Sequence, residues 1–377
     1  MQLAPFLLDE WLDQKNLPNA RIEFDLGSST GPAWTLGELL ALGAPDEAGP
    51  LTDLKLLYTA AAGSLPLRQG IAALEGVEPD DVQVTTGGAE ALLILFFLAA
   101  EPGANVILPH PGFPPDKSIA ESLGVEVRSY NLRRENEFRI DPGEVLSLID
   151  DNTRLLLVNS PHNPTGSVLT AHALETLHDS CENRGVQFVC DQVYHPIYHG
   201  PASPSAARLP RATVLGDFSK ALCLSGLRVG WIVERDPERR KQYRNARSHF
   251  TVSNTALGEH LAAFAVRHSG AIYDRALSVS QRNLALVDEV VRENQDLIRW
   301  VRPQGGMTAL PWLSEGGDAR AFCQRLLPHG ILLAPGDCFG MPDHFRLGFG
   351  ATAEKFGAAL ERFAEVLKSQ AREPSPA

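Results

Sequence analysis

Short apolar runs alternate with helix-like stretches through the middle of the chain. Runs that are apolar throughout are typical of strands buried on both faces of a sheet. The expected strands are Val82–Val84, Asn105–Leu108, Leu155–Val158, Val186–Cys190, Thr213–Leu215 and Arg228–Val233. The expected helices between them are Ala89–Ala100, Ser118–Leu123 and Ala171–Arg184. This alternation predicts an α/β domain with a mostly parallel sheet and helices on both faces.

The pattern changes after about Glu234, where long helices are followed by short strands near Gly306–Leu310 and His344–Phe349. A final helix carries one apolar stripe, because its hydrophobic residues are spaced by four, three and four: Phe356, Leu360, Phe363 and Leu367. We expect this part to form a smaller α+β domain. The predicted division is a large domain at 49–255 and a small domain built from 1–48 and 256–377.

Composition narrows the class of protein. The 377 residues are 44% hydrophobic and 21% charged, which leaves room for two cores. A net charge of -12 without a basic cluster argues against a nucleic-acid surface. The start of the chain lacks the pattern of a signal peptide, and the longest apolar run, Ala91–Ala100, is too short to span a membrane. Five cysteines without CxxC spacing indicate neither a disulfide framework nor a metal site, so we expect a cytoplasmic protein.

The segment from Asp217 to Gly230 suggests the chemistry. Lys220 follows a short apolar strand, and a lysine in an apolar setting can lose its proton and act as a nucleophile that forms a Schiff base. Arg228 lies between two glycines, and its planar fork suits a phosphate. Taken alone, the segment is more typical of a solvated surface lysine, so the prediction depends on the groups that the rest of the chain supplies.

Two further strand ends carry polar groups. Asn163 lies in a loop of prolines and glycine directly after the strand Leu155–Val158, where its amide can donate to a ligand oxygen. Asp191 ends the strand Val186–Cys190, and Tyr194 follows three residues later. A carboxylate there can pair with a protonated ring nitrogen, and the phenol can donate to an oxygen of the same ring. A simple turn and a helix cap are the alternatives.

The start of the predicted helix at Ala89 offers an anion site. Gly88 and Ala89 would present free backbone N–H groups there, and the spacing matches no nucleotide-binding loop. Phe113 follows another strand and can stack on a flat ring, although core packing is the favoured explanation when this residue is considered in isolation. Together, the strand ends supply what pyridoxal phosphate requires: a Schiff-base lysine, an acid for the ring nitrogen, a hydrogen-bond donor and a phosphate cup.

These residues resemble those of the fold-type I, class I/II pyridoxal-phosphate aminotransferases over most of the chain. The resemblance implies that Lys220 forms the Schiff base and that Asp191 pairs with the ring nitrogen. Asn163 and Tyr194 would donate to the ring oxygen, and Arg346 would bind the substrate α-carboxylate. It also implies a homodimer with shared sites. The remaining implied cofactor contacts are Phe113 on the ring, Gly88, Ala89, Ser219 and Arg228 on the phosphate, and Tyr58 on the phosphate of the neighbouring subunit's cofactor.

Three positions depart from the family pattern. Asp217 stands where a serine or threonine often binds the phosphate, and a carboxylate there is repulsive unless it is protonated or turned away. The loop from Asp25 to Pro32 matches the family's substrate loop only loosely. Pro115 and Asp116 stand where many relatives carry a tyrosine. The serine-rich loop and the turn Cys223–Arg228 also resemble pyridoxal-phosphate cyclases of the capreomycidine synthase type.

The expected activity is transfer of an amino group between an α-amino acid and a 2-oxo acid. A pyridoxal-phosphate lyase or cyclase acting on an amino acid is the alternative, because the same fold supports each of these reactions. A DNA-binding regulator of this fold is disfavoured, since the chain is acidic and shows no helix-turn-helix pattern before Tyr58. The amino donor and acceptor stay open.

Overall fold

The structure, a computed structural model, describes residues 2–351 and 354–370. A seven-stranded sheet lies in its larger part, in the order β2-β8-β7-β6-β5-β3-β4. Neighbouring strands are parallel except at β8, which is antiparallel to both of its neighbours. The mostly parallel sheet is therefore confirmed. Its strands are β2 (Val82–Thr85), β3 (Asn105–His110), β4 (Glu126–Asn131), β5 (Thr153–Asn159), β6 (Gln187–Asp191), β7 (Thr213–Asp217) and β8 (Gly230–Val233).

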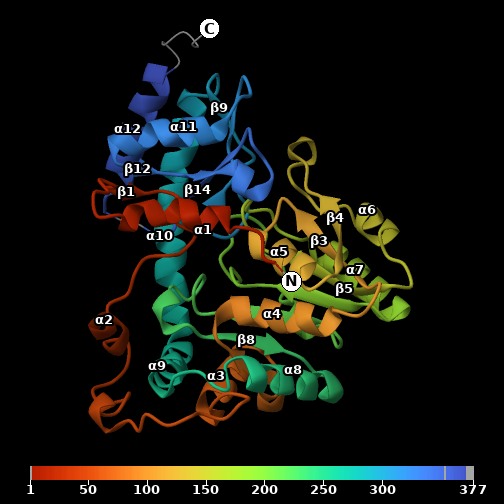
Figure 1. Ribbon diagram of the computed structural model, residues 1–377. Helices are drawn as coiled ribbons and strands as arrows, with labels where there is room; N and C mark the ends of the chain where they lie inside the picture. Colours follow the sequence, from red (N-terminus) through yellow and green to blue (C-terminus); the bar gives the residue numbers. More distant parts are fainter. Residues whose placement is uncertain (1, 352–353, 371–377) are drawn as a thin grey trace.

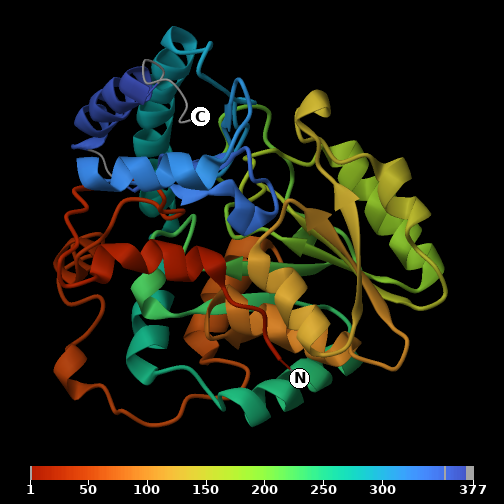
Figure 2. The same cartoon turned by 45° about the horizontal axis from the view of Figure 1, so that its top comes forward.

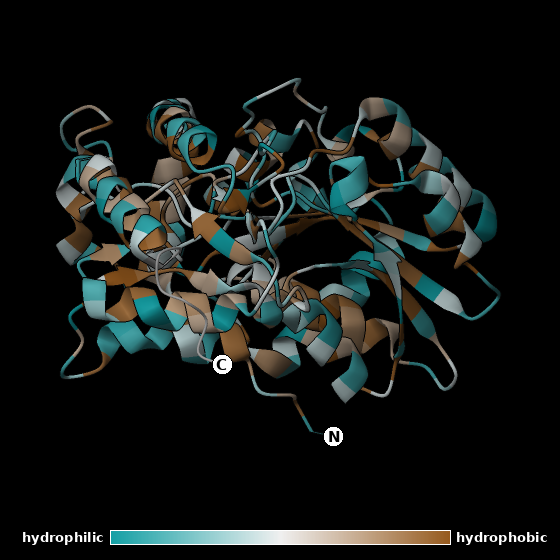
Figure 3. Cartoon of the chain, turned by 90° about the horizontal axis from the view of Figure 1, so that it is seen from above, coloured by the Kyte–Doolittle hydropathy of each residue, from teal (hydrophilic) through white to brown (hydrophobic). Residues whose placement is uncertain are grey.

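Helices cover both faces of this sheet, as expected (Figures 1 and 2). Alternate strand residues point to opposite faces. Leu156 and Val158 of β5 join one core with α3 (Leu65–Glu75), α6 (Pro142–Ser147), α7 (Ala171–Arg184) and α9 (Ala256–Arg267). Leu155 and Leu157 join a second core with α4 (Gly87–Ala99), α5 (Pro114–Ser122) and α8 (Pro237–Phe250). In Figure 3 the outer sides of the helices carry many hydrophilic residues.

A separate core joins the two ends of the chain. Trp11, Phe24 and Leu26 pack with residues of the C-terminal part. The stripe residues of the last helix are all buried in this core, which confirms that prediction. The elements of this smaller part are α1 (Leu7–Leu12), β1 (Phe24–Asp25), β9 (Ile298–Arg299), β10 (Thr308–Ala309), β11 (Trp312–Leu313), α11 (Ala319–Leu326), β12 (Ile331–Leu332), β13 (Ala334–Pro335), β14 (Phe345–Gly348) and α12 (Phe356–Gln370).

The long helix α10 (Ser269–Glu293) connects the two parts (Figure 1). Ile272 near its start packs in the large core, whereas Leu284 and Val287 pack in the small one. Leu39 of α2 (Leu36–Leu40) also packs in the large core, as do side chains of α9. The domain division at residues 49 and 256 stays a prediction.

The antiparallel direction of β8 matters for the site. Thr85, the last residue of β2, and Asp217, the last residue of β7, both pair with Gly230 at the start of β8. The residues that precede β8 therefore lie at the same edge of the sheet as the carboxyl ends of the other strands. This brings Arg228 to the edge where ligands of such sheets bind. Within the described ranges, no helix has the length and apolar character needed to cross a bilayer.

Candidate active site

A cavity of about 240 Å³ opens at the carboxyl edge of the sheet. Most of the predicted site residues line it, although they come from five separate stretches of the chain: Gly88, Ala89, Phe113, Asn163, Asp191, Tyr194, Ser219, Lys220 and Arg228. Tyr58 and Arg346 are not in its wall. The structure thus brings together groups that the sequence places far apart.

Lys220 lies just beyond the end of β7 and is surrounded by protein. Burial lowers its pKa to about 8, against the opposing effect of the negative charge of Asp217. Its Nζ donates a hydrogen bond of 2.8 Å to Oγ of Ser29. Much more of this side chain is therefore a neutral amine near neutral pH than for an exposed lysine, and nucleophilic chemistry requires the neutral form.

Asp191 ends β6 on another side of the cavity. Burial raises the pKa of its carboxyl to about 7. The N–H of Val193 donates to its Oδ1 at 3.1 Å, and the Nδ2 of Asn159 donates to its carbonyl at 3.0 Å. The same Asn159 accepts the N–H of Asn163 at 2.7 Å, so one buried amide fixes two predicted site residues. A cationic ring nitrogen facing Asp191 would favour its ionised form.

Arg346, on β14 of the small part, is 1% exposed and reaches the wall of the site through Asn163. Its Nη1 donates to Oδ1 of Asn163 at 3.2 Å, and its Nη2 donates to the carbonyl of Gly27 at 2.7 Å. The ring of Phe339 lies 5.2 Å from the guanidinium carbon. The Nε has no hydrogen-bond partner among the described residues. A buried donor of this kind is suited to a carboxylate ligand.

The start of α4 lies against Arg228. Gly87 has φ +74°, and a Cβ there would lie 2.7 Å from Nη2 of Arg228, so a residue with a side chain would crowd the guanidinium. The Nη1 of Arg228 donates to the carbonyl of Ser225 at 3.2 Å and to Oγ of Ser219 at 3.4 Å. First-turn N–H groups, a hydroxyl and a guanidinium thus converge, and such groups bind phosphate.

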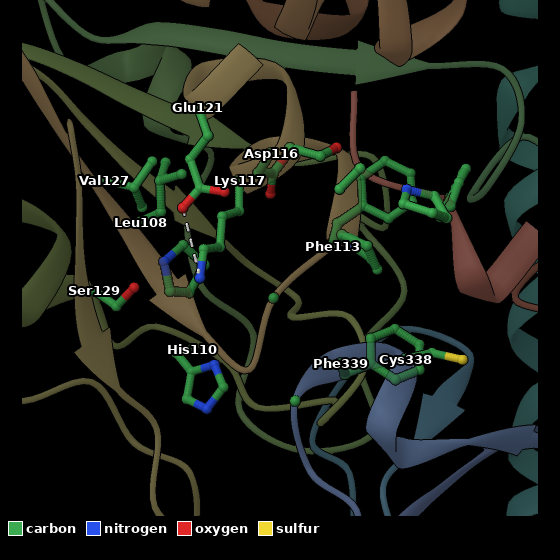
Figure 4. A pocket seen from close by; sticks show the side chains of 18 residues that line it. Leu108, His110, Phe113, Asp116, Lys117, Glu121, Val127, Ser129, Cys338 and Phe339 are labelled. Atoms are coloured by element: carbon green, nitrogen blue, oxygen red, sulfur yellow. Dashed lines mark ion pairs between the residues drawn. The ribbon is translucent and has the colours of Figure 1, made fainter. Parts of the chain in front are cut away.

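Phe113 lines both this cavity and a second one of about 340 Å³, so it lies between the two. Figure 4 shows the second cavity, with Phe113 and Asp116 from one segment and Phe339 from the small part. The Lys117–Glu121 ion pair, at 3.7 Å, lies in its wall. Asp116, one of the departures from the family pattern, is 3% exposed, and burial holds the pKa of its carboxyl well above the usual range.

Tyr58 lies apart from the other predicted residues. It is 85% exposed, in a stretch without helix or strand between Leu54 and Ala60. Glu259 of α9 anchors this stretch, since its two carboxylate oxygens accept from Thr59 Oγ1 and from the N–H of Ser64, each at 2.6 Å. Within one chain, Tyr58 cannot contribute to the cavity.

Ser29 is a contact that the sequence does not predict. Its hydroxyl accepts from Lys220, and its carbonyl accepts from the hydroxyl of Tyr194 at 2.9 Å. Thr30, the next residue, lines the cavity. The serine-rich composition of this loop was the only sequence signal, and it does not indicate which residue reaches the lysine.

Comparison with known proteins identifies the family. The model of the family "Aminotransferase class I and II" matches residues 53–363. The chain belongs to this family. It is also 32% identical to capreomycidine synthase of Streptomyces vinaceus over 97% of its own length and 94% of the relative's.

Solved structures of the family have the same fold. A pyridoxal-phosphate-dependent aminotransferase from Streptococcus suis superposes with a TM-score of 0.92 at 27% identity, covering 99% of this chain and all of that one. The pyridoxal-phosphate-dependent cyclase OrfR superposes with a TM-score of 0.87 at 28% identity, covering 98% of each chain. The expected fold-type I architecture is therefore confirmed, and the protein is a pyridoxal-phosphate-dependent enzyme.

The residues of the cavity fit this cofactor. The converging donors at the start of α4 suit its phosphate, and the carboxylate of Asp191 in the same wall is a group that can pair with a protonated ring nitrogen. The side chain of Phe113 offers a flat face for the ring. The lowered pKa of Lys220, about 8, suits a covalent bond to its aldehyde.

Proposed function

We propose that this protein is an aminotransferase that moves an amino group between an α-amino acid and a 2-oxo acid. When bound, pyridoxal phosphate supplies an aldehyde that reacts with amines and a ring that accepts electron density. The chain supplies the base, the carboxylate-binding group and the acid that faces the ring nitrogen.

One relationship carries this proposal. The loop after β1 contacts Arg346 through the carbonyl of Gly27 and Lys220 through the hydroxyl of Ser29, only two residues later. The carboxylate-binding guanidinium and the amine are therefore held close together. An amino acid has its carboxylate and its α-proton on the same carbon. An enzyme that binds the one and removes the other therefore needs its guanidinium and its amine close together.

In this proposal each residue has a defined task. Arg346 binds the substrate carboxylate with its guanidinium, and the unpartnered Nε is available for that contact. The Nζ of Lys220 removes the proton from the substrate Cα and returns it in the later half of the reaction. Asp191 keeps a proton on the ring nitrogen. Asn163 donates to the ring oxygen, and so does Tyr194 once its hydroxyl turns away from the carbonyl of Ser29.

The proposal includes a homodimer in which Tyr58 serves the neighbouring site. Leu56, Leu57 and Tyr58 are 83%, 69% and 85% exposed in one chain. Consecutive exposed hydrophobic residues of this size are typical of an interaction surface. A second copy that covers these residues would also place the hydroxyl of Tyr58 next to the phosphate-binding groups of that second copy.

A second candidate is a cyclase or lyase that uses the same cofactor. The near full-length similarity to capreomycidine synthase and the match to OrfR favour it. Such an enzyme would share the lysine, the aspartate and the arginine, and would differ in how the substrate side chain departs or attacks.

Product analysis separates these candidates. The holoenzyme is mixed with an excess of single amino acids, and the released products are quantified per active site. Transfer predicts one equivalent of 2-oxo acid and an enzyme that retains its cofactor in the amine form. Release of ammonia, or a ring-closed product, with the cofactor still in the aldehyde form would exclude transfer and establish the second candidate.

A further inference from the structure

Asp217, the last residue of β7, has two carboxylate oxygens in different surroundings. The residue is 7% exposed. Its Oδ1 accepts the backbone N–H of Ser219 at 2.9 Å and that of Lys220 at 3.2 Å. Its Oδ2 lies toward α4, 3.6 Å from the position that a Cβ on Gly88 would occupy. The carboxyl therefore faces the cavity at the start of that helix.

This is the region where the proposed function places the cofactor phosphate. Gly88, Ala89, Ser219 and Arg228 line the same cavity as Asp217. A phosphate ester carries a charge of about -1.5 to -2 near pH 7. An ionised carboxylate beside it in a buried site would be strongly repulsive, because little solvent screens the two groups.

We propose that Asp217 is a phosphate-binding residue that acts as a neutral carboxylic acid and donates a hydrogen bond from Oδ2 to a phosphate oxygen. The two N–H groups already directed at Oδ1 leave Oδ2 as the oxygen that carries the proton. The proton comes from solvent, and no covalent bond to carbon or phosphorus changes. This inference rests on the proposed position of the phosphate.

The surroundings of Asp217 favour the neutral form. Burial raises the pKa of the carboxyl, and this effect outweighs the positive charge of Lys220 and the hydrogen bonds from Ser219 and from the backbone N–H of Lys220, all of which lower it. Asp191 of β6 lines the same cavity, and the charge of Asp217 contributes to the raised pKa of Asp191. Tyr194 and Arg228 are the other titratable or charged groups in the same cavity. On its other side, Asp217 lines a cavity of about 200 Å³, whose wall also contains Glu75, His195 and Tyr273.

Proton uptake makes phosphate binding depend on pH. If Asp217 is ionised in the empty site, binding of pyridoxal phosphate must be accompanied by uptake of one proton. The dissociation constant of pyridoxal phosphate then increases by up to about tenfold for each unit that the pH rises. Lys220 acts in the other direction, since a neutral amine is needed for the covalent bond. The two effects are separated by comparing pyridoxal phosphate with pyridoxal, which has the aldehyde but lacks the phosphate.

The test is a titration of the cofactor-free full-length protein with each compound between pH 7 and 9, followed by absorbance. The phosphate is a dianion throughout, because its second pKa is about 6. For the wild type, the dissociation constant of pyridoxal divided by that of pyridoxal phosphate should fall steadily as the pH rises. In Asp217→Asn, whose amide donates at every pH, this ratio should stay constant. Asp217→Ser provides a second neutral donor if the asparagine variant folds poorly, and should also give a constant ratio.

The outcomes are distinct. The same fall in all three proteins would overturn the role of Asp217. A wild-type ratio that is constant and well below that of Asp217→Asn would also overturn it, because it would show a carboxylate that stays ionised beside the phosphate, whereas a constant ratio equal to that of Asp217→Asn would show an acid that is protonated over the whole range. If neither compound binds covalently to the wild type, the proposed function itself fails. If pyridoxal phosphate binds covalently but the wild-type ratio is constant and well below that of Asp217→Asn, only the inference about Asp217 fails.

Discussion

The Nζ of Lys220 donates to the hydroxyl of Ser29 at 2.8 Å, although 191 residues separate the two in the sequence. Ser29 lies four residues after β1, which pairs with β12 of the small part. The loop therefore joins the small part to the lysine of the large one. The neighbouring carbonyl contact to Tyr194 attaches the same residue to a second cavity side chain.

Loss of this hydroxyl should slow the reaction without preventing substrate binding. In Ser29→Ala, Lys220 loses the hydrogen bond that orients it, which is worth about 1 kcal/mol. We expect kcat to fall about fivefold, with KM little changed. Ser29→Thr is the matched control, because it keeps the hydroxyl, and it should retain most of the activity. Equal losses in both variants would instead assign the effect to the shape of the loop.

The state of Lys220 should be visible in its reactivity. Burial lowers its pKa to about 8, so below that pH most of the side chain is a protonated and unreactive ammonium. The rate at which cofactor-free enzyme reacts with pyridoxal should rise about tenfold per unit at lower pH and level off above pH 8. Pyridoxal is used because it avoids any effect at the phosphate. A rate that keeps rising to pH 10 would show that the lysine has an ordinary pKa.

Several parts of the fold and site follow from the sequence alone. The ends of β2, β5, β6 and β7 can be located to within two residues, because each strand contains a short run of mostly apolar residues. β4 was missed because it lies at the sheet edge and is polar and partly exposed, as in Glu126, Arg128 and Asn131. Arg228 was assigned to a strand, but β8 begins at Gly230, and Arg228 lies in the left-handed region at φ +51° just before it.

Contacts across the two parts of the chain could not be predicted in the same way. The hydrogen bonds of Ser29 and of Gly27 depend on how the small part packs against the sheet, and no local pattern encodes that packing. The surroundings of Asp217 are a similar case. The sequence shows that Asp217 lies three residues before Lys220. It does not show that the N–H groups of Ser219 and Lys220 both donate to Oδ1, because this depends on the geometry of the turn after β7.

Arg346 should control substrate affinity. Hydrogen bonds to a charged group are worth about 1.5–3 kcal/mol, so Arg346→Ala should raise KM for the amino acid about 10- to 100-fold. Arg346→Lys keeps the charge but lacks the planar fork, and it should lie between the wild type and the alanine variant. Amines without a carboxylate serve as the control substrates, and their reaction should change much less. An unchanged KM in Arg346→Ala would exclude this carboxylate-binding role.

The exposed stretch at Tyr58 should mediate assembly. Replacing Leu56 and Leu57 with aspartate puts two charges into the proposed interface, so the variant should be a monomer by light scattering and should lose most of its activity. Tyr58→Phe should remain a dimer and should bind pyridoxal phosphate less tightly, because only one hydroxyl is removed. A wild-type protein that is monomeric at micromolar concentration would contradict the shared site.

The central claim is that Lys220 binds the cofactor covalently. The most direct measurement is reduction of the holoenzyme with borohydride, followed by digestion and mass spectrometry of the lysine-containing peptides. We expect the reduced cofactor to be attached to Lys220 and Lys220→Arg to carry none. Attachment to a different lysine in the wild type, or no attachment in a protein saturated with pyridoxal phosphate, would contradict it.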